Sequence, residues 1–292
     1  MTDTTQLWRI CIDIIDEHVP AFDLALEPFI ESIMWTVDED VRGMQRMEGF
    51  TTFRPDSAVL AQALETTAKA LGVAAPIAEI EDLAPRDWVA ENLKDFPPID
   101  AGRFFIYASH IDLRPLPGRI PIRIDPGAAF GTGTHATTSG CLKAIEALGK
   151  KHSFKRPLDV GSGSGILAIA MAKLWRIKIA GTDIDPVAVR VARKNAQLNH
   201  VARLLDFNTG PGFDPVPAKA RYDLIVANIL ARPLIAIAPD LARHLSSGGY
   251  TVLSGFIVRD ERFVMAAYLA QGFKFTRRYV CEDWVTLVLQ KR

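Results

Sequence analysis

The feature that most constrains the fold is an apolar strand followed by a glycine-rich turn and a helix, PLDVGSGSGILAIA, at residues 157–170. Gly161, Gly163 and Gly165 alternate with small residues before a helix that is expected to begin near Ile166. Glycines let the backbone approach a ligand closely, and a helix N-terminus presents unpaired N–H groups to an anion. The segment therefore predicts a parallel α/β sheet with a ligand at the carboxyl ends of its strands.

The spacing of the glycines distinguishes a methyltransferase pattern from a dinucleotide-binding pattern. Asp159 precedes them in the pattern D-x-G-x-G-x-G, whereas a dinucleotide fingerprint has the spacing G-x-G-x-x-G. This chain has Ile166 where that fingerprint needs its third glycine. The pattern resembles that of class I S-adenosylmethionine-dependent methyltransferases. A dinucleotide site and a turn without a ligand are the alternatives.

A carboxylate follows the second expected strand of this sheet. Asp183 lies 22 residues after Gly161, where the next parallel strand is expected to end. A carboxylate there can accept hydrogen bonds from both ribose hydroxyls of an adenosyl ligand. Asp185 directly precedes Pro186, so we expect it to cap the next helix instead.

An asparagine ends the apolar strand YDLIVAN at residues 222–228. The amide of Asn228 offers an acceptor and a donor, which suits it to orient an amine nucleophile. A turn residue at the strand end is the alternative interpretation. The sequence from Asn228 matches the N-P-P-Y motif of amino methyltransferases in its first residue only, so the aromatic that would stack on a flipped base is missing. We therefore expect no direct nucleic-acid specificity.

A segment rich in glycine and threonine, residues 125–138, precedes a helix and is expected to form a polar loop that closes over a ligand. Its hydroxyls and N–H groups could bind an amino-acid carboxylate. His135 could act as a base or order the loop through a hydrogen bond, and we assign it no proton transfer. Phe130 could wall off the pocket or simply pack within the loop.

Residues 101–292 alternate apolar strands with helices, which is typical of a doubly wound parallel sheet covered on both faces. A hairpin near the C-terminus, with three connecting residues, is expected to be antiparallel and to lie at one edge. The expected strands are 104–109, 120–124, 157–160, 178–182, 222–228, 250–254, 273–280 and 284–289, with helices beginning near Gly165, Pro186 and Pro233.

The first 84 residues predict a small α+β domain. The expected order is a strand at 7–15, a helix at 20–37, a strand at 44–53, a helix at 58–71 between Asp56 and Gly72, and a strand at 77–83. Residues 85–100, bounded by prolines, predict a linker helix before the domain at 101–292.

The charge is divided between the two halves of the chain. Residues 1–100 carry 20 acidic against 7 basic side chains, a net charge of −13, and residues 101–292 carry +13. An acidic domain attracts a basic macromolecule and repels nucleic acid. Solvated faces, or attraction between the two halves, are the alternatives.

The composition is that of an ordinary globular protein, with 49% hydrophobic residues. No stretch approaches the apolar length of a membrane-spanning helix, and no secretory signal is evident. Three scattered cysteines predict neither a disulfide framework nor a metal site. We expect a cytoplasmic, monomeric protein that does not bind membranes.

Four segments together resemble the PrmA family, the methyltransferases of large-subunit ribosomal protein eleven. They are DPGAAFGTGTHATT, LDVGSGSGILAIA, TDIDPVAV and ANILARPL. The resemblance implies an N-terminal substrate-recognition domain, a linker helix and a seven-stranded class I methyltransferase domain with a Rossmann-like sheet. It also implies S-adenosylmethionine as cofactor, with contacts at Thr138, Gly161, Asp183 and Asn228.

Around those positions we also expect Gly163, Gly165 and Phe130 to line the cofactor site, and Asn228 to position the amine. The expected reaction is methyl transfer to lysine or N-terminal amines of the basic ribosomal protein, held by the acidic N-terminal domain. The neutral leaving group requires no metal, and we expect no dedicated general base. Another protein's lysine or a small amine is the alternative acceptor, and a nucleotide-binding module or a dehydrogenase is a third possibility.

Overall fold

The structure is a computed structural model that describes residues 7–30, 32–37, 44–51, 53–83, 98–108, 111, 117–125 and 135–292. The chain divides into two compact units, Met1–Asp87 and Trp88–Arg292. The linker helix expected over 85–100 falls largely outside the described residues, although Ile99 and Asp100 belong to strand β5 (Ile99–Ala101).

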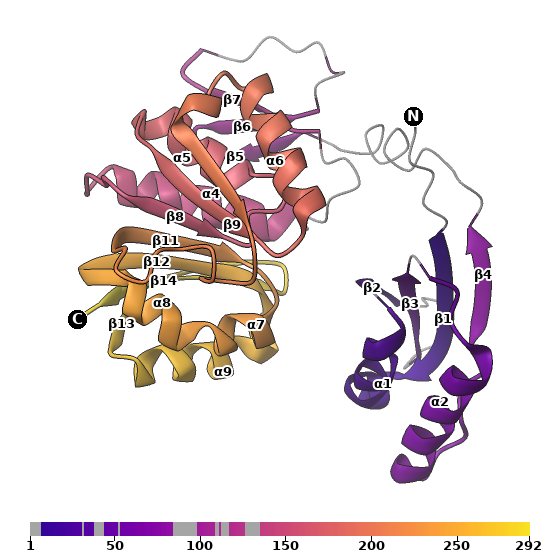
Figure 1. Cartoon of the computed structure of the whole chain (residues 1–292). Coiled ribbons are helices and arrows are strands. Elements are labelled where there is room, and N and C mark those ends of the chain that lie inside the picture. The colour runs from indigo at the N-terminus through magenta and orange to yellow at the C-terminus, as the bar shows by residue number, and fades with distance from the viewer. Residues whose placement is uncertain are drawn as a thin grey trace. The chain divides into compact units, whose positions relative to one another are not determined.

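The first unit is a four-stranded antiparallel sheet with two helices on one face (Figure 1). Along the first strand Ile10, Ile12 and Ile14 enter the core beneath the helices, whereas Arg9 and Asp13 alternate with them on the other face. The sheet order is β2-β3-β1-β4, with β1 (Leu7–Ile15), β2 (Ser32–Val37), β3 (Met44–Thr51) and β4 (Glu79–Leu83), and the helices are α1 (Val19–Leu26) and α2 (Ser57–Leu71).

The helix expected over 20–37 is wrong in its second half. Helix α1 ends at Leu26, Pro28 lies in the 3-10 turn Glu27–Phe29, and residues 32–37 form β2. Proline has no N–H to continue the helical hydrogen bonds. The segment SIMWTV, rich in aromatic and β-branched residues, pairs with β3 along six positions, which supplies partners for its backbone.

Helix α2 confirms its predicted ends. The carboxylate of Asp56 accepts hydrogen bonds from the N–H groups of Ala58 at 2.9 Å and Val59 at 3.2 Å. Gly72 ends the helix in the left-handed conformation, with φ of 71°. Both ends therefore follow from local chemistry.

The second unit contains the predicted doubly wound sheet, with seven strands in the order β10-β9-β8-β11-β12-β14-β13. Neighbouring strands are parallel except at β14, which pairs antiparallel with both β12 and β13, so the predicted hairpin at one edge is confirmed. The strands are β8 (Pro157–Val160), β9 (Ile179–Asp183), β10 (Leu205–Thr209), β11 (Tyr222–Asn228), β12 (Leu245–Ile257), β13 (Phe273–Cys281) and β14 (Trp284–Lys291).

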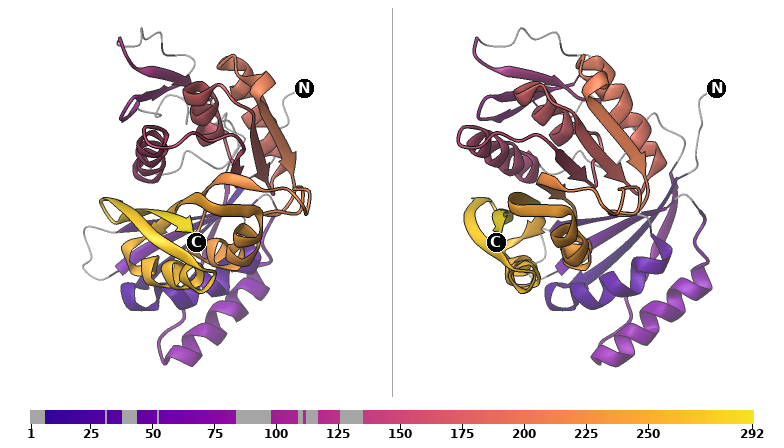
Figure 2. Two further views of the ribbon diagram at one scale, coloured as in Figure 1. Left: turned by 90° about the vertical axis from the view of Figure 1, so that its left-hand side faces the viewer. Right: turned by 60° about the vertical axis from the view of Figure 1, so that its left-hand side comes forward.

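Helices cover both faces of this sheet (Figures 1 and 2). One face packs against α4 (His135–Gly149), α5 (Ile166–Trp175) and α6 (Pro186–Leu198). The other packs against α7 (Ala231–Ala236), α8 (Ala238–His244) and α9 (Val258–Ala270). Strand β10 and helices α8 and α9 were not among the predicted elements.

A separate three-stranded sheet precedes α4 and packs against the same core as α5. It consists of β5, β6 (Phe104–Tyr107) and β7 (Ile120–Arg123), in which Phe104, Ile106 and Ile122 are fully buried. The sequence predicted two of these strands but not that they form a sheet of their own. Its last strand leads into the glycine- and threonine-rich segment.

Candidate active site

The glycine-rich turn after β8 has the left-handed backbone that its sequence predicts. The φ angles of Gly161, Gly163 and Gly165 are 70°, 51° and 81°. A Cβ atom at Gly161 would lie 2.3 Å from the Cγ2 atom of Ile229, so a side chain there would also collide with the end of β11. The turn is therefore fixed by conformation and by packing.

Asp159 is buried in the last part of β8, just before this turn. Its Oδ2 atom accepts a hydrogen bond from the N–H of Ala168 at 3.0 Å, while its Oδ1 atom has no partner among the described residues. Burial raises the pKa of Asp159 to about 7, and the negative charge of Asp183 adds to the rise. The carboxylate thus favours a cation close to the turn.

Asp183 lies at the end of β9 and is directly linked to the turn. Its Oδ2 atom accepts a hydrogen bond from the N–H of Gly163 at 2.7 Å, and its Oδ1 atom accepts one from the N–H of Asp185 at 3.0 Å. The side chain of Asp185 instead caps α6 by accepting from the N–H of Val187 at 2.6 Å. The structure confirms that Asp185 caps the next helix. The ribose contact of Asp183 stays a prediction.

Asn228 lies at the end of β11, on the other side of β8 from Asp183. Its Nδ2 atom donates a hydrogen bond to the Oγ1 atom of Thr137 at 3.3 Å. Its Oδ1 atom is buried without a partner among the described residues. Since an acceptor buried in this way is costly, the geometry favours a ligand that donates a hydrogen bond to it.

The sequence interpretation missed the contribution of Asn195 in α6, which is fully buried. Its Nδ2 atom donates to the carbonyl oxygens of Ser164 at 2.9 Å and Asp125 at 3.2 Å, and its Oδ1 atom accepts from the N–H of Asp125 at 3.0 Å. One amide therefore ties the glycine-rich turn to the start of the glycine- and threonine-rich segment. No local signal marks such a residue, because its partners are far away in sequence.

The structure brings most of the predicted site residues to one edge of the sheet. Gly161, Gly163 and Gly165 form the turn that bonds Asp183, and the end of β11, which carries Asn228, packs against it. Thr138 is buried in the first turn of α4, but the hydroxyl that contacts Asn228 belongs to its neighbour Thr137. Phe130 lies outside the described residues. In the part of the chain that is described, no cluster of His, Cys, Asp and Glu could hold a metal, and no helix is long and apolar enough to cross a membrane.

The strand order, with the glycine turn after its central strand and the acid after the next, defines a class I methyltransferase fold. A family model described as "Ribosomal protein L11 methyltransferase (PrmA)" matches residues 27–292. The chain belongs to this family.

Relatives and a solved structure extend this match. The ribosomal protein L11 methyltransferase of Chelativorans sp. (strain BNC1) is 48% identical over 73% of this chain and 74% of its own length. That of Caulobacter sp. (strain K31) is 41% identical over 96% of this chain and 92% of its own length. The crystal structure of a ribosomal protein L11 methylase from Lactobacillus delbrueckii subsp. bulgaricus is 30% identical and covers 67% of this chain and 98% of its own, with a TM-score of 0.61.

Proposed function

We propose that this protein transfers methyl groups from S-adenosylmethionine to amine nitrogens of ribosomal protein L11. The observation that carries the proposal is the glycine turn bonded to Asp183, in a chain that belongs to the PrmA family over residues 27–292. The named activity of the relatives supports the same acceptor protein.

The residues at the sheet edge fit a cationic adenosyl ligand. Asp183 uses one lone pair of each oxygen for backbone N–H groups and keeps others for ribose hydroxyls. Buried oxygens without partners among the described residues, Asp159 Oδ1 and Ser162 Oγ, favour the positive charge and the donors of an amino-acid moiety. The glycines leave room for backbone contact. Thr138 and Phe130 are proposed to complete this site.

When bound, S-adenosylmethionine supplies an electrophilic methyl group on a cationic sulfur that leaves as a neutral thioether. The acceptor must be a neutral amine, and deprotonating a lysine of ordinary pKa at pH 7 costs roughly 4.6 kcal/mol. Asn228 can accept an N–H of that amine on Oδ1, which directs its lone pair. Because positioning replaces a general base here, water is the proposed acceptor of the proton.

The N-terminal unit is the proposed docking site for the basic substrate. Helices cover one face of its sheet, and the other face carries four carboxylates with two arginines, Asp13, Glu48, Glu79, Glu81, Arg9 and Arg46. Arg46 contacts Glu79 at 2.6 Å and Arg9 contacts Glu81 at 2.5 Å. The face keeps a net negative charge of −2, which attracts a basic protein.

The decisive experiment is transfer of a tritiated methyl group to purified L11, with a small lysine peptide as the alternative acceptor. Asp183→Ala is expected to weaken binding of S-adenosylhomocysteine by about 1–3 kcal/mol, measured by calorimetry. Asp185→Asn is the matched control, because this side chain caps α6 and should leave affinity almost unchanged. Binding of NAD, or labelling of the peptide but not of L11, would overturn the proposal.

The docking face has its own test. Asp13→Asn with Glu81→Gln is expected to raise the KM for L11 by about threefold to tenfold and to reduce its salt dependence. The control is Glu27→Gln with Glu65→Gln, which removes the same charge from exposed positions on the helical side. Equal effects of the two pairs would assign the attraction to net charge rather than to this face.

A further inference from the structure

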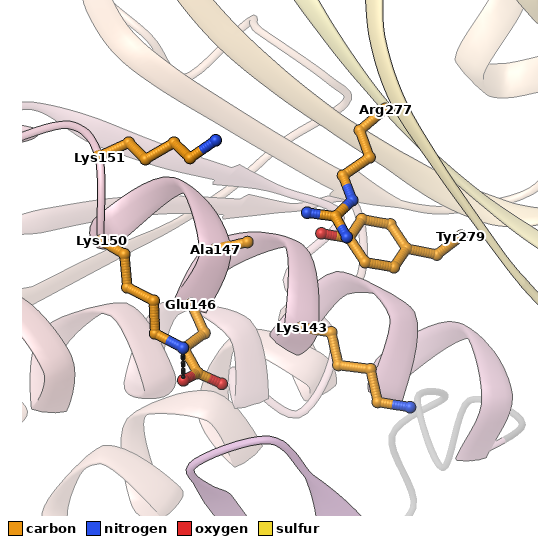
Figure 3. Close-up of a pocket in the computed structure, with 7 residues that line it drawn as sticks. All are labelled: Lys143, Glu146, Ala147, Lys150, Lys151, Arg277 and Tyr279. Carbon is orange, nitrogen blue, oxygen red and sulfur yellow. Dashed lines mark ion pairs between the residues drawn. The ribbon is translucent and has the colours of Figure 1, made fainter.

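A hollow of about 380 Å³ lies between the end of α4 and the edge strand β13. It is distinct from the candidate active site, because Ala147 in its wall follows Thr137 by ten residues, about 15 Å along the helix. Figure 3 shows the residues that line it, which are Lys143, Glu146, Ala147, Lys150, Lys151, Arg277 and Tyr279.

Four of these residues are cations and one is an acid. The carboxylate of Glu146 is already engaged by the ammonium of Lys150 at 2.7 Å and by the N–H of Arg103 at 3.1 Å. Across the described ranges, no carboxylate lies within ion-pair distance of Lys151, Arg277 or Lys143. The hollow therefore has positive charge that no carboxylate of the described residues neutralises.

Arg278, the next residue on β13, pairs with a carboxylate, in contrast to Arg277. The guanidinium of Arg278 contacts the carboxylate of Glu261 through hydrogen bonds at 2.9 and 2.7 Å. Arg277 instead lies over the ring of Tyr279, 4.9 Å from its centroid. This contact holds the guanidinium at the hollow, and no carboxylate in the described part of the chain pairs with its fork of N–H donors, which can therefore face an anion.

Three donors border the same space. In Figure 3 the ammonium of Lys151 points toward the side of the hollow where the guanidinium of Arg277 and the hydroxyl of Tyr279 lie, and the short side chain of Ala147 is below them. Lys143 extends away from this group. The planar guanidinium of Arg277, the ammonium of Lys151 and the hydroxyl of Tyr279 can all donate hydrogen bonds to the oxygens of a phosphate.

We propose that Lys151, Arg277 and Tyr279 form a binding site for a backbone phosphate of RNA. The hollow is at an edge strand and its cations are exposed, so it suits a phosphate carried on a chain. The hollow belongs to residues 101–292, which carry a net charge of +13 and attract a polyanion, whereas the whole chain is neutral. The choice of RNA rests on the proposed function, because a ribosomal protein is itself a partner of RNA. Such contacts carry no base specificity.

The test is fluorescence anisotropy of a labelled single-stranded RNA 12-mer of mixed sequence, titrated with the full chain at several salt concentrations. Lys151→Gln with Arg277→Gln is expected to weaken binding about tenfold or more and to reduce the slope of log affinity against log salt by about 1.4. Tyr279→Phe keeps the ring under Arg277 and is expected to cost about threefold, for one hydrogen bond.

The matched control is Arg190→Gln with Lys194→Gln, which removes the same charges from the exposed surface of α6. Equal weakening in both pairs would show that only net charge attracts RNA, and would overturn the site. Inorganic phosphate that binds as tightly as the 12-mer, and loses affinity in the Lys151 and Arg277 variant, would assign the hollow to a free phosphate and overturn the RNA assignment.

Methyl transfer to free L11 separates this proposal from the proposed function. The Lys151 and Arg277 variant is expected to keep the wild-type rate on free L11, because both residues lie outside the candidate active site. A wild-type chain that binds RNA through this pair but methylates no L11 would refute the proposed acceptor while supporting the phosphate site.

Discussion

Replacing the buried Asp159 by asparagine is expected to stabilise the protein at neutral and alkaline pH. The pKa of this carboxyl is raised from 3.8 to about 7, chiefly by burial, and the charge of Asp183 contributes. That rise corresponds to about 4 kcal/mol between the protonated and ionised forms. The hydrogen bond from Ala168 is kept, because the amide oxygen of asparagine can still accept it.

The sign of the pH dependence follows from proton binding. Between about pH 4 and pH 7 the folded chain holds a proton on Asp159 that the unfolded chain has lost, so raising the pH across this window reduces stability. The free energy of unfolding of the wild-type protein should fall by up to about 4 kcal/mol because of this group as the pH rises, whereas that of Asp159→Asn should not fall for this reason. The stability difference between variant and wild type should therefore be small at pH 4.5 and reach its maximum at pH 8.

Urea unfolding of both proteins at pH 4.5, 6 and 8, followed by circular dichroism, measures this difference. Groups that do not interact with residue 159 titrate alike in the two chains, so their contributions cancel. Asp206→Asn, at an exposed position, is the control and should change stability by less than about 0.5 kcal/mol at each pH. A stability difference between Asp159→Asn and wild type that does not change from pH 4.5 to pH 8 would refute the reasoning.

Three further substitutions test how the site is assembled. Gly161→Ala is expected to destabilise the chain by about 1–3 kcal/mol in thermal unfolding, because its Cβ would collide with Ile229 at a φ of 70°. Asn195→Ala removes the side-chain hydrogen bonds to the backbone of Asp125 and Ser164 and should cost about 2–4 kcal/mol in urea unfolding. Thr137→Val is expected to lower kcat for L11 about tenfold with affinity for S-adenosylmethionine unchanged, because the hydrogen bond that orients Asn228 is lost. Thr137→Ser should restore the rate, and a fall in donor affinity instead would argue against that role.

The site residues that could be predicted are those whose chemistry is local. Glycines at three alternate positions indicate a turn with a left-handed backbone. Pro186 after Asp185 marks the start of a helix and its cap. Both predictions follow from a few neighbouring residues. Asp183 could be placed because the length of one strand and helix unit sets where the next parallel strand ends.

The features that the sequence did not predict depend instead on contacts between distant segments. Apolar residues from 20 to 37 fit a helix as well as a helix followed by a strand, and only pairing with β3 decides between them. The small sheet of β5, β6 and β7 and the contact between Asn228 and Thr137 depend on segments distant in sequence. Asn195 resembles any polar helix residue until its partners at Asp125 and Ser164 are known.

Helix α4 runs between the two proposed sites, and Gly140 makes one of its close contacts with the sheet. A Cβ atom at Gly140 would lie 2.2 Å from the Oγ1 atom of Thr286 in β14, so this glycine lets the helix approach the strand. That hydroxyl is hydrogen-bonded to the Oγ atom of Ser254 at 2.9 Å, which fixes it in turn. Because a helix is rigid over this length, this contact and the buried face of α4 together set the height of Thr137 beside Asn228 at one end and of Ala147 beside β13 at the other. The positions of the proposed amine site and of the proposed phosphate site therefore depend on the same packing.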